Sequence, residues 1–397
     1  MTITADIAII GRGFAGLSAA LVCADAGFQV VIIGSRAKPR GGLQLGPNSF
    51  TSLSELPFGD AVLSQTQPLD SIIISQLGSE RRLAELPHPE QRFYASMSRA
   101  TLNDILETLC SDHGRISMIS SSVKTGIFGK GRPAAQIVTD DGLLVSATYV
   151  IGADGQNGFS RQLFSPQHPP EADYVAMRAE CHSDSLPALF SQPHTRLMLG
   201  SGCHFVCYPF TQSQQVNLVY CMDKRQLTTG WQEQAFSGSA LLAPLKSDAI
   251  SWHSTPLSPA MHMPVWQHQR LTLIGDAAHS MPPHLAQGAG QSFDDVACLK
   301  QALEAELSLN SGGAGGRLPA LGAALSNMAT LRARMTGPVT RKAGVTGAMM
   351  RAGHLPGQVR NLLLDAGGEM ILNSWMDDVW SSSSDRHPSA ANRRTRT

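Results

Sequence analysis

LTLIGDAAHSMPPHLAQGAGQSFDDVACLKQAL, residues 271–303, combines a short apolar run, a loop rich in proline and glycine, and an amphipathic helical segment. The run Leu271–Ile274 is long enough for a buried strand. Asp276 follows at its carboxyl end, where a doubly wound sheet places its ligands. Gly288 and Gly290 let the backbone approach a flat group, and the free N–H groups of the helix start favour negative charge. The stretch alone leaves two interpretations open, a cofactor-binding unit and an ordinary strand–loop–helix crossover.

The N-terminus carries a second ligand-binding pattern. An apolar strand, Ala5–Ile10, is followed at once by Gly11-Arg12-Gly13-Phe14-Ala15-Gly16 and by the helical run Leu17–Ala26. In such a GxGxxG turn the first glycine makes the turn, the second admits a pyrophosphate, and the third lets helix and strand pack closely. This context of strand, turn and helix favours a dinucleotide site, and with it an α/β fold of Rossmann type.

The second strand, Gln29–Ile33, lacks the acid expected at its end. An Asp or Glu about 20 residues after the glycines ordinarily holds the adenosine ribose, but that position is Gly34. Ser35 is a substitute as a hydroxyl partner, and Arg36 as a contact to the adenosine or a phosphate. We therefore predict an altered, weaker ribose contact.

Composition and length exclude several classes of protein. The 397 residues include 31 Lys and Arg and 31 Asp and Glu, so net charge gives no reason to expect nucleic acid or an anionic membrane as a partner. The length suffices for two domains, and no apolar run reaches the ~18 residues of a membrane span. No signal peptide is expected. Seven scattered cysteines predict a cytoplasmic protein without a disulfide framework. Cys203-His204-x-x-Cys207 has no second pair, so we expect no metal site.

Two early segments have features of a ligand site. Residues 40–48, RGGLQLGPN, are too rich in glycine for a helix and predict a loop that crosses a ligand. Within it, Gln44 has two interpretations, a hydrogen bond to a ring edge or simple solvation. A helix with apolar residues at helical spacing begins at Ser98. Arg99 lies in its first turn, where the helix dipole disfavours a cation, so we expect a bound anion beside it.

A second acid at a strand end follows in the middle of the chain. Ile137–Asp141 and Leu143–Val145 predict a hairpin around Asp-Gly, and Tyr149–Ile151 predicts another buried strand. Asp154-Gly155 comes next, within GADGQN. Asp154 is either a turn former or a group that faces the ligand, and the presence of Asp276 in the same chain favours the second interpretation.

From about Glu171 to His262 the pattern predicts strands without intervening helices. Thr195–Leu199, Cys203–Pro209 and Val216–Met222 are expected to be neighbours in an antiparallel sheet, and Ser71–Gln76 an edge strand of the same domain.

Period two places His204, Val206 and Tyr208 on one face of their strand, and Cys203, Phe205 and Cys207 on the other. His204 and Tyr208 would stand roughly 13 Å apart, at about 3.3 Å per residue. That separation suits a grip on the two ends of a small aromatic molecule, and it equally suits a solvated face. Further helices are predicted over Gln291–Leu307, Ala320–Arg334 and Arg351–Met370, with a docked segment Ser374–Trp380, a loop Asn310–Arg317 and a disordered tail Ser381–Thr397.

Three motifs together resemble those of a known family. GRGFAG at Gly11–Gly16, GADGQNGFSR at Gly152–Arg161 and GDAAHSMPPHLAQGAG at Gly275–Gly290 are similar, in order and spacing, to the glycine, DG and GD motifs of single-component FAD-dependent aromatic hydroxylases, the p-hydroxybenzoate hydroxylase-like superfamily. The resemblance covers nearly all of residues 6–380. GLQLGPNS, HFVCYPF and PPHLAQGAG look most like the branch that acts on salicylate, 3-hydroxybenzoate or 6-hydroxynicotinate. Gly34, Gly158 and Ser160 depart from the family pattern.

The resemblance implies a Rossmann-like FAD-binding domain, an inserted antiparallel-sheet substrate domain and a helical C-terminus. The expected boundaries are 1–70, 93–168 and 263–350 for the FAD-binding domain, 71–92 and 169–262 for the substrate domain, 351–380 for the helical segment, and 381–397 for the tail.

The resemblance also implies the site residues. Contacts to FAD are expected at Gly11, Gly13, Phe14, Ala15, Gly16, Ser35, Arg36, Gln44, Arg99, Val123, Asp154, Gly155, Asp276, Pro283, Gly288, Ala289 and Gly290. Contacts to the substrate are expected at Gln44, His204, Tyr208, Pro283 and His284. We expect His204 to be the general base, since a neutral imidazole titrates near working pH. Tyr208 is expected to hydrogen-bond the substrate, and His284 to orient the substrate or its carboxylate.

The implied activity is hydroxylation of a small phenolic or hydroxy-N-heteroaromatic substrate. NADH or NADPH would reduce the FAD, and O2 would add to give a flavin C4a-hydroperoxide in a site that excludes water. Two alternatives stay open at this stage. One is another flavin enzyme on the same fold, such as a ubiquinone-pathway ring hydroxylase or a prenyl-chain reductase. The other, prompted by Gly34, is a flavin-binding protein without catalysis. A homodimer is also left open.

Overall fold

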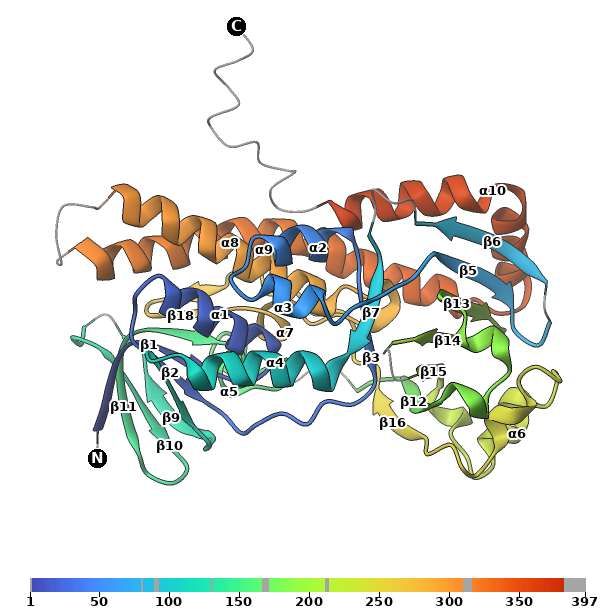
Figure 1. Cartoon of the computed structure of the whole chain (residues 1–397), viewed down its shortest axis with the longest axis horizontal. Helices are drawn as coiled ribbons and strands as arrows, with labels where there is room; N and C mark the ends of the chain where they lie inside the picture. Colours follow the sequence, from blue (N-terminus) through green and yellow to red (C-terminus); the bar gives the residue numbers. More distant parts are fainter. Residues whose placement is uncertain are drawn as a thin grey trace, which may run out of the picture.

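The computed structural model describes residues 2–79, 81–88, 93–129, 131–165, 171–210, 214–309 and 316–381. Two large sheets lie at opposite ends of the molecule, and long C-terminal helices run along both of them (Figure 1). The predicted tail from residue 382 onward and residues 310–315 of the predicted loop lie outside the described residues.

The first sheet is built around the N-terminal strand. Its order is β17-β18-β11-β1-β2-β8, with β10 and β9 added beside β11. The central pairs β18–β11, β11–β1, β1–β2 and β2–β8 are parallel. Its strands are β1 (Thr2–Ile10), β2 (Val30–Ile33), β8 (Ile116–Ile119), β9 (Val123–Ile127), β10 (Ala135–Thr139), β11 (Leu144–Gly152), β17 (Gln267–His268) and β18 (Leu271–Leu273).

Alternate residues of β1 enter two cores, as period two requires. Ile7 and Ile9 pack with the helices α1 (Phe14–Asp25), α4 (Arg99–Asp112) and α8 (Gly288–Leu309). Ala8 and Ile10, which alternate with them along the strand, face the core under β10. The predicted hairpin before this core is present, but its second strand and the predicted strand Tyr149–Ile151 are one continuous strand, β11. A single strand results because β11 pairs antiparallel with β10 and parallel with β1.

The second sheet has the order β16-β12-β15-β14-β13-β5-β6. Its strands are β5 (Ser71–Gln76), β6 (Arg82–Pro87), β12 (Tyr174–His182), β13 (His194–Leu199), β14 (His204–Pro209), β15 (Gln215–Asp223) and β16 (His253–Pro256). The antiparallel order β13-β14-β15 is as predicted. The prediction that Ser71–Gln76 is an edge strand is wrong, since β5 pairs with both β13 and β6. The expected absence of helices is also wrong, because the helix α6 (Trp231–Phe236) covers one face of this sheet.

A three-stranded sheet joins the two parts. It consists of β3 (Gly42–Leu45), β7 (Ala95–Ser98) and β4 (Gln67–Pro68), and is accompanied by α2 (Pro47–Ser54) and α3 (Gly59–Leu63). Residues 42–45 were predicted as loop on their glycine content. They form a strand instead because β3 finds a partner in β7, 50 residues later in the chain.

The C-terminal helices are longer than predicted. α9 spans Arg317–Met350, and α10 spans His354–Trp380 with a non-helical residue at Gly367. α9 continues past the predicted end because its second half buries Val339 and Ala343. The predicted break before Ser374 is absent for the same reason, since Met376 and Trp380 reach a core shared with β14. Among the described helices, none has the length and apolar character of a bilayer span.

Candidate functional site

The glycine turn has the geometry of a pyrophosphate site. Gly11 has a φ of 113°, and a Cβ there would overlap the carbonyl of Ala153. A Cβ on Gly16 would overlap the carbonyl of Gly11, so this glycine lets α1 pack on β1. Gly13 is different, because a Cβ there would meet no atom within 4 Å. No side chain caps α1 at Gly13, and its first N–H groups stay open to an anion.

The three motifs meet at one place. The glycine turn touches the DG motif where Gly11 packs on Ala153, and it touches the GD motif where Ala15 lies against Gly275. The side chain of Arg161 ties the other two motifs together, since its guanidinium donates to the carbonyl of Ala277 over 2.8 Å. These contacts join residues that are up to 260 positions apart and bring the three motifs side by side.

Gly34, which occupies the position where a ribose-binding acid was expected, lies against the glycine turn. A Cβ at Gly34 would come within 3.0 Å of the Arg12 nitrogen, so a side chain here would crowd the turn. The acid beside the turn comes from α4 instead. Glu107 accepts from Arg12 with both carboxylate oxygens, at 2.5 to 3.0 Å. Arg36 pairs with Asp104 at an exposed position, and Ser35 is exposed.

One face of α4 lines the groove with polar groups. Arg99, Asn103 and Glu107 recur every four residues and therefore share that face. Ser98 caps the helix by accepting from the Thr101 N–H. Arg99 donates through Nε to the carbonyl of Gly42 over 3.0 Å. Asn103 is 1% exposed, and neither its amide nitrogen nor its amide oxygen has a partner. A buried amide without partners is costly, so Asn103 retains an unused donor and an unused acceptor between Arg99 and Glu107.

The DG motif closes around its own carboxylate. Asp154 accepts from the Ser160 N–H over 2.9 Å, while its other oxygen is buried without a partner. A Cβ at Gly158 would overlap the Asp154 carboxyl, so glycine is required there. Gly158 and Ser160, the two residues of this motif that depart from the family pattern, are therefore compatible with its geometry. Burial raises the pKa of Asp154 above its ordinary value, and Gly155 beside it has open space for a ligand.

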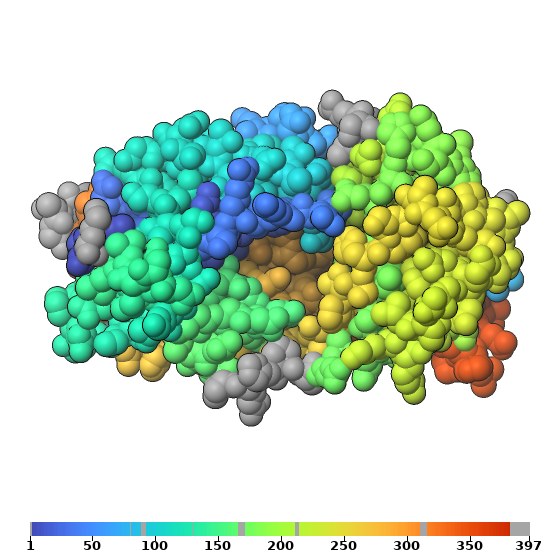
Figure 2. Space-filling model, turned by 90° about the horizontal axis from the view of Figure 1, so that it is seen from below, coloured from blue at the N-terminus to red at the C-terminus, as the bar shows by residue number. Residues whose placement is uncertain are grey.

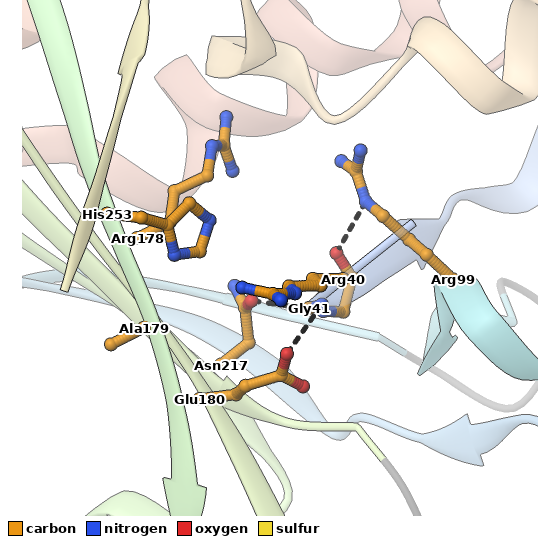
Figure 3. A pocket seen from close by; sticks show the side chains of 9 residues that line it. Arg40, Gly41, Arg99, Arg178, Ala179, Glu180, Asn217 and His253 are labelled. Atoms are coloured by element: carbon orange, nitrogen blue, oxygen red, sulfur yellow. Dashed lines mark hydrogen bonds between the residues drawn. The ribbon is translucent and has the colours of Figure 1, made fainter. Parts of the chain in front are cut away.

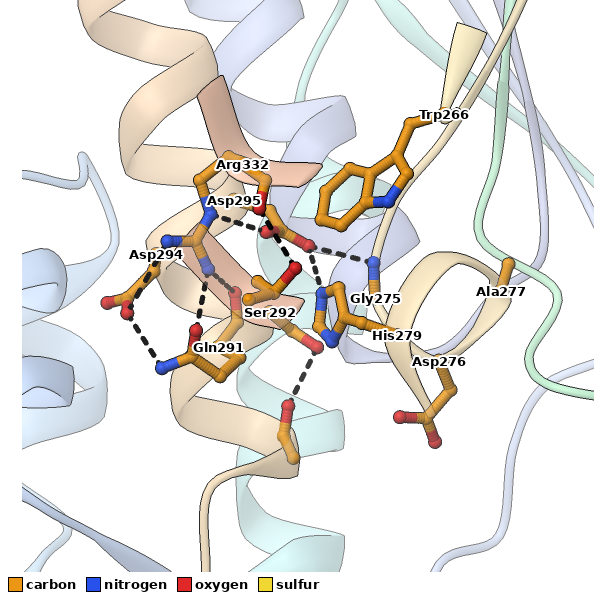
Figure 4. Close-up of polar contacts among 12 residues, drawn as sticks. Trp266, Gly275, Asp276, Ala277, His279, Gln291, Ser292, Asp294, Asp295 and Arg332 are labelled. Atoms are coloured by element: carbon orange, nitrogen blue, oxygen red, sulfur yellow. Dashed lines mark hydrogen bonds and ion pairs between the residues drawn. The ribbon is translucent and has the colours of Figure 1, made fainter. Parts of the chain in front are cut away.

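The GD loop is held by a buried ion-pair network behind it (Figure 4). Asp295 accepts from the Gly275 N–H over 2.9 Å, from His279 over 2.7 Å and from Arg332 over 2.8 Å. Asp276 points away from this network (Figure 4). Its carboxylate is reachable by solvent, although the surrounding protein desolvates it enough to raise its pKa. Of Asp276, Asp294 and Asp295, Asp276 is thus the one exposed to solvent.

The start of α8 has one open glycine and one packed glycine. A Cβ at Gly288 would meet no atom within 4 Å, so this position admits a close ligand. A Cβ at Gly290 would lie 2.5 Å from Ser49 Oγ. Gly290 therefore serves the packing of α2 on α8, which corrects the prediction that both glycines approach a flat group. Pro283 is exposed and Ala289 partly buried beside these glycines.

A hollow opens between the parts of the molecule that carry the two large sheets (Figure 2). Its rim is formed by segments near residues 35–45, in blue, 150–165, in green, and 255–265, in yellow, and orange-brown atoms of the later GD segment form its floor. The strand β3 and the residue before it are hydrogen-bonded to the second sheet. Gly42 N–H donates to Asn217 over 3.0 Å and Gly41 N–H donates to Glu180 over 3.2 Å (Figure 3). Gln44 donates to Thr195. Gln44 is thus bonded to the second sheet in this structure.

The sheet face beyond β3 carries three rows of side chains, as the strand register requires. His204 pairs with Cys221, Val206 with Val219, and Tyr208 with Asn217. Their neighbours on β12 are Ala176, Arg178 and Glu180. The opposite face of β14 holds Phe205 and Cys207, in the core under α6. Period two thus separates Cys203 and Cys207 from His204, so these three side chains cannot converge on a metal.

Two histidines and an arginine meet at the inner end of this face. The rings of His204 and His284 lie edge to face with centroids 5.2 Å apart. His284, in the short helix Pro283–Leu285, contacts Arg351 through Nε2 over 3.0 Å. Tyr208 lies in a separate core with Trp380, Leu285 and their neighbours.

Burial shifts the pKa of His204, His284 and Tyr208. Burial, reinforced by His284, Arg351 and Arg360, lowers the pKa of His204 well below its ordinary value. Burial, with Arg351 and Arg178, lowers the pKa of His284 to about 3. The expectation that His204 titrates near neutral pH is therefore wrong for this structure. Burial raises the pKa of Tyr208 to about 12, against the opposing effect of Arg99 and Arg178, so the phenol stays protonated.

Several functional candidates were missed from sequence. Glu107, Asn103 and Arg351 carry no local motif, and nor do Asp295 and Arg332. Helical spacing from Arg99 was the available signal for Asn103 and Glu107. The sequence held no signal for Arg332 and Arg351, because their partners Asp295 and His284 lie 37 and 67 positions away. Val123, expected near the cofactor, begins β9 and is partly buried beside the core under β10.

Comparison with known proteins agrees with this arrangement. Residues 4–316 match the family model described as FAD binding domain. 3-Hydroxybenzoate 6-hydroxylase 1 of Aquipseudomonas alcaligenes is 25% identical over 326 residues, 76% of this chain and 81% of that protein. 6-Hydroxynicotinate 3-monooxygenase of Bordetella bronchiseptica is 26% identical over 335 residues, 75% and 82% of the two chains. The structure of Klebsiella pneumoniae HpxO complexed with FAD and uric acid superposes with a TM-score of 0.79 at 18% identity, covering 95% of this chain and 97% of that one.

Proposed function

The chain belongs to the FAD binding domain family, and from that premise we propose that it is an FAD-dependent monooxygenase of small aromatic molecules. It would use NAD(P)H and O2 to hydroxylate a phenolic or hydroxy-N-heteroaromatic ring. The curated relatives, named for the hydroxylation of 3-hydroxybenzoate and 6-hydroxynicotinate, support this activity. The observation that carries the proposal is the meeting of the three motifs in one groove, at the domain boundary beside the His204 face.

The groove has the donors and the space that FAD requires. The open turn at Gly13 and the uncapped start of α1 suit the diphosphate. Glu107 and the unpaired amide of Asn103 suit the adenosine and ribityl hydroxyls, and Asp276 suits a further hydroxyl. Gly288 leaves room for the ring system at the start of α8. Bound there, FAD supplies the redox chemistry, taking a hydride from NAD(P)H and activating O2 to transfer one oxygen atom to the ring.

We propose that His204 accepts a hydrogen bond from the substrate hydroxyl. A phenol has an ordinary pKa of about 10 and an imidazole of about 6.5, so full proton transfer would be uphill by about 5 kcal/mol or more. The pKa of His204 is lower still. His204 therefore acts first as a neutral hydrogen-bond acceptor, which draws electron density onto the ring. The proton moves to it as the ring is oxidised, when the acidity of the hydroxyl rises.

Tyr208 and His284 position the ring. Tyr208 remains a protonated donor, because burial raises its pKa to about 12. His284 is held by Arg351 on one side and by the His204 ring on the other. The walls between these groups are apolar side chains such as Val206 and Leu285. Such walls exclude water, and exclusion of water favours oxygen transfer over release of hydrogen peroxide.

Two measurements on the purified protein test the proposal. The protein, or the protein with added FAD, should show bound-flavin absorbance, and small aromatic acids should stimulate coupled NAD(P)H and O2 consumption. The His204→Ala variant should lose at least tenfold in kcat for hydroxylation while retaining FAD. His268→Ala, an exposed histidine in β17, is the matched control. Near wild-type kcat across pH in His204→Ala would refute the role of His204, and a protein that takes up no FAD would refute the function.

The proposal extends to the domain division and the cellular setting. We keep the boundaries given above, with the FAD-binding domain contributed by three separate segments. A cytoplasmic location and a homodimer complete the proposal, and light scattering of the purified chain tests the second.

A further inference from the structure

A cluster of nitrogen groups at the inner end of the substrate face has unused hydrogen-bonding capacity. Nδ1 of His204, Nδ1 of His284 and Nε of Arg351 are all buried, and none has a partner. The cluster is continuous, since the two rings are 5.2 Å apart and Arg351 reaches His284 over 3.0 Å. Three unpaired nitrogens in one place exceed what a folded interior ordinarily leaves unsatisfied.

The tautomer of His284 turns its free nitrogen into a donor. Arg351 can only donate, so Nε2 of His284 must accept from it. The proton of the neutral ring is then on Nδ1. The unused groups therefore include two N–H donors, Nδ1 of His284 and Nε of Arg351, and both require an acceptor.

Arg351 also lacks a counter-charge in the described part of the chain. Its recorded side-chain contacts are His284 and the ring of Tyr174, over which its guanidinium lies at 4.0 Å. Neither contact carries a negative charge at neutral pH. A half-buried guanidinium without a carboxylate is unfavourable, and it becomes favourable when an anion enters.

The position of Arg351 is fixed by the corner between the last two helices. Arg351 follows the last residue of α9, and Arg360 of α10 donates to the carbonyls of Met349, Met350 and Ala352 around it. Gly347, one turn earlier, lies so close to His284 that a Cβ there would overlap the ring. The guanidinium is thus held next to His284 rather than left free to reach solvent.

Resting on the proposed function, we infer that Arg351 and His284 bind the carboxylate of an aromatic acid and so determine which substrates the enzyme accepts. An Arg paired with a carboxylate gives short, charge-assisted hydrogen bonds. With the acid group held there, the ring lies toward His204 and its hydroxyl can reach that imidazole. Arg351 lies outside residues 4–316, which match the family model, at the corner between α9 and α10.

The test compares each acid with its uncharged amide. Salicylate, 3-hydroxybenzoate and 6-hydroxynicotinate, each with the corresponding amide, are titrated by calorimetry into the FAD-loaded protein without NAD(P)H. We expect the wild type to bind at least one acid ten- to a hundredfold more tightly than its amide. Arg351→Gln should abolish that preference while leaving affinity for the amide within about threefold. Arg341→Gln, the same change at an exposed position of α9, is the matched control and should keep the preference.

The remaining outcomes separate the inference from the proposed function. An acid-to-amide preference that is unchanged in Arg351→Gln, whether or not both affinities fall, would contradict a carboxylate contact by Arg351. Arg351→Lys separates charge from geometry, since it should restore only part of the preference. A wild type that binds no acid better than its amide overturns the inference outright. Binding of an acid without coupled NAD(P)H and O2 consumption would instead refute the proposed function and leave the carboxylate site in place.

Discussion

Asp295→Asn should destabilise the fold and loosen the cofactor site together. Asp295 is fully buried and holds the Gly275 N–H, His279 and Arg332 at 2.7 to 2.9 Å. Burial works to raise its pKa, but His279 and Arg332 outweigh that effect and hold the pKa of Asp295 below its ordinary value. An asparagine keeps the shape but removes the charge. The guanidinium of Arg332, 1% exposed, then keeps its hydrogen bonds to Gln291, but its remaining carboxylate is Asp294 at 3.9 Å.

The magnitude follows from the burial of both partners. Breaking a buried ion pair by removing one charge costs about 3–5 kcal/mol. With an unfolding entropy of about 2.1 cal/mol/K per residue, a chain of this size loses roughly 4–6 °C in Tm. FAD affinity should fall as well, because the Gly275 backbone beside Asp276 loses a charged acceptor.

Thermal melting of the FAD-free protein and flavin-fluorescence titration measure the two effects. Lys300→Gln on the same helix removes an exposed charge from a pair with Glu304 and should cost less than about 0.5 kcal/mol. The double variant Asp295→Asn/Arg332→Met removes both charges. Its free energy of unfolding should exceed, by at least about 1 kcal/mol, the value obtained by adding the effects of the two single substitutions.

A loss below about 1 kcal/mol in Asp295→Asn would refute this reasoning, as would strict additivity in the double variant. Either result would mean that the network is not energetically coupled, whatever its geometry.

Three further predictions concern the cofactor turn, the relocated acid and the effect of pH. Gly13→Val should leave the Tm of the FAD-free protein nearly unchanged but raise the Kd for FAD at least tenfold, because its side chain enters open space that the diphosphate needs. Gly16→Ala should instead lower the Tm, because its Cβ overlaps the carbonyl of Gly11. Glu107→Gln should weaken FAD about tenfold in fluorescence titrations but spare FMN, since Arg12 and Glu107 lie beside Gly34, where we expect the adenosine to bind; equal losses for both would contradict this. His284 has a folded pKa of about 3, below the unfolded 6.5, so its stability contribution is complete above pH 6.5 and falls as the pH drops. Between pH 7 and 5 this effect lowers the free energy of unfolding by about 2 kcal/mol. Urea unfolding at a series of pH values should therefore show a smaller loss of stability in acid for His284→Gln than for the wild type.

The sequence alone determined the parallel sheet and its cofactor turns, because each is a local pattern. A strand, a glycine turn and a helix follow one another within 25 residues at Gly11–Gly16, and their spacing carries the geometry. Period two likewise placed His204 and Tyr208 on the opposite face from Cys207, as the structure has them. Local patterns were misleading where pairing is distant: β3 was predicted as a loop because its partner, β7, follows 50 residues later.

The tertiary structure decided how those local units meet and how the site residues are charged. Gly34 marked a missing acid, but only the packing of α4 on the glycine turn shows Glu107 beside Arg12. His204 was expected to titrate near neutral pH, and its true environment depends on burial and on Arg351, which comes from the other end of the chain. A pKa depends on every charge and every desolvating atom within several ångströms. Those neighbours are set by folding and not by adjacency along the chain.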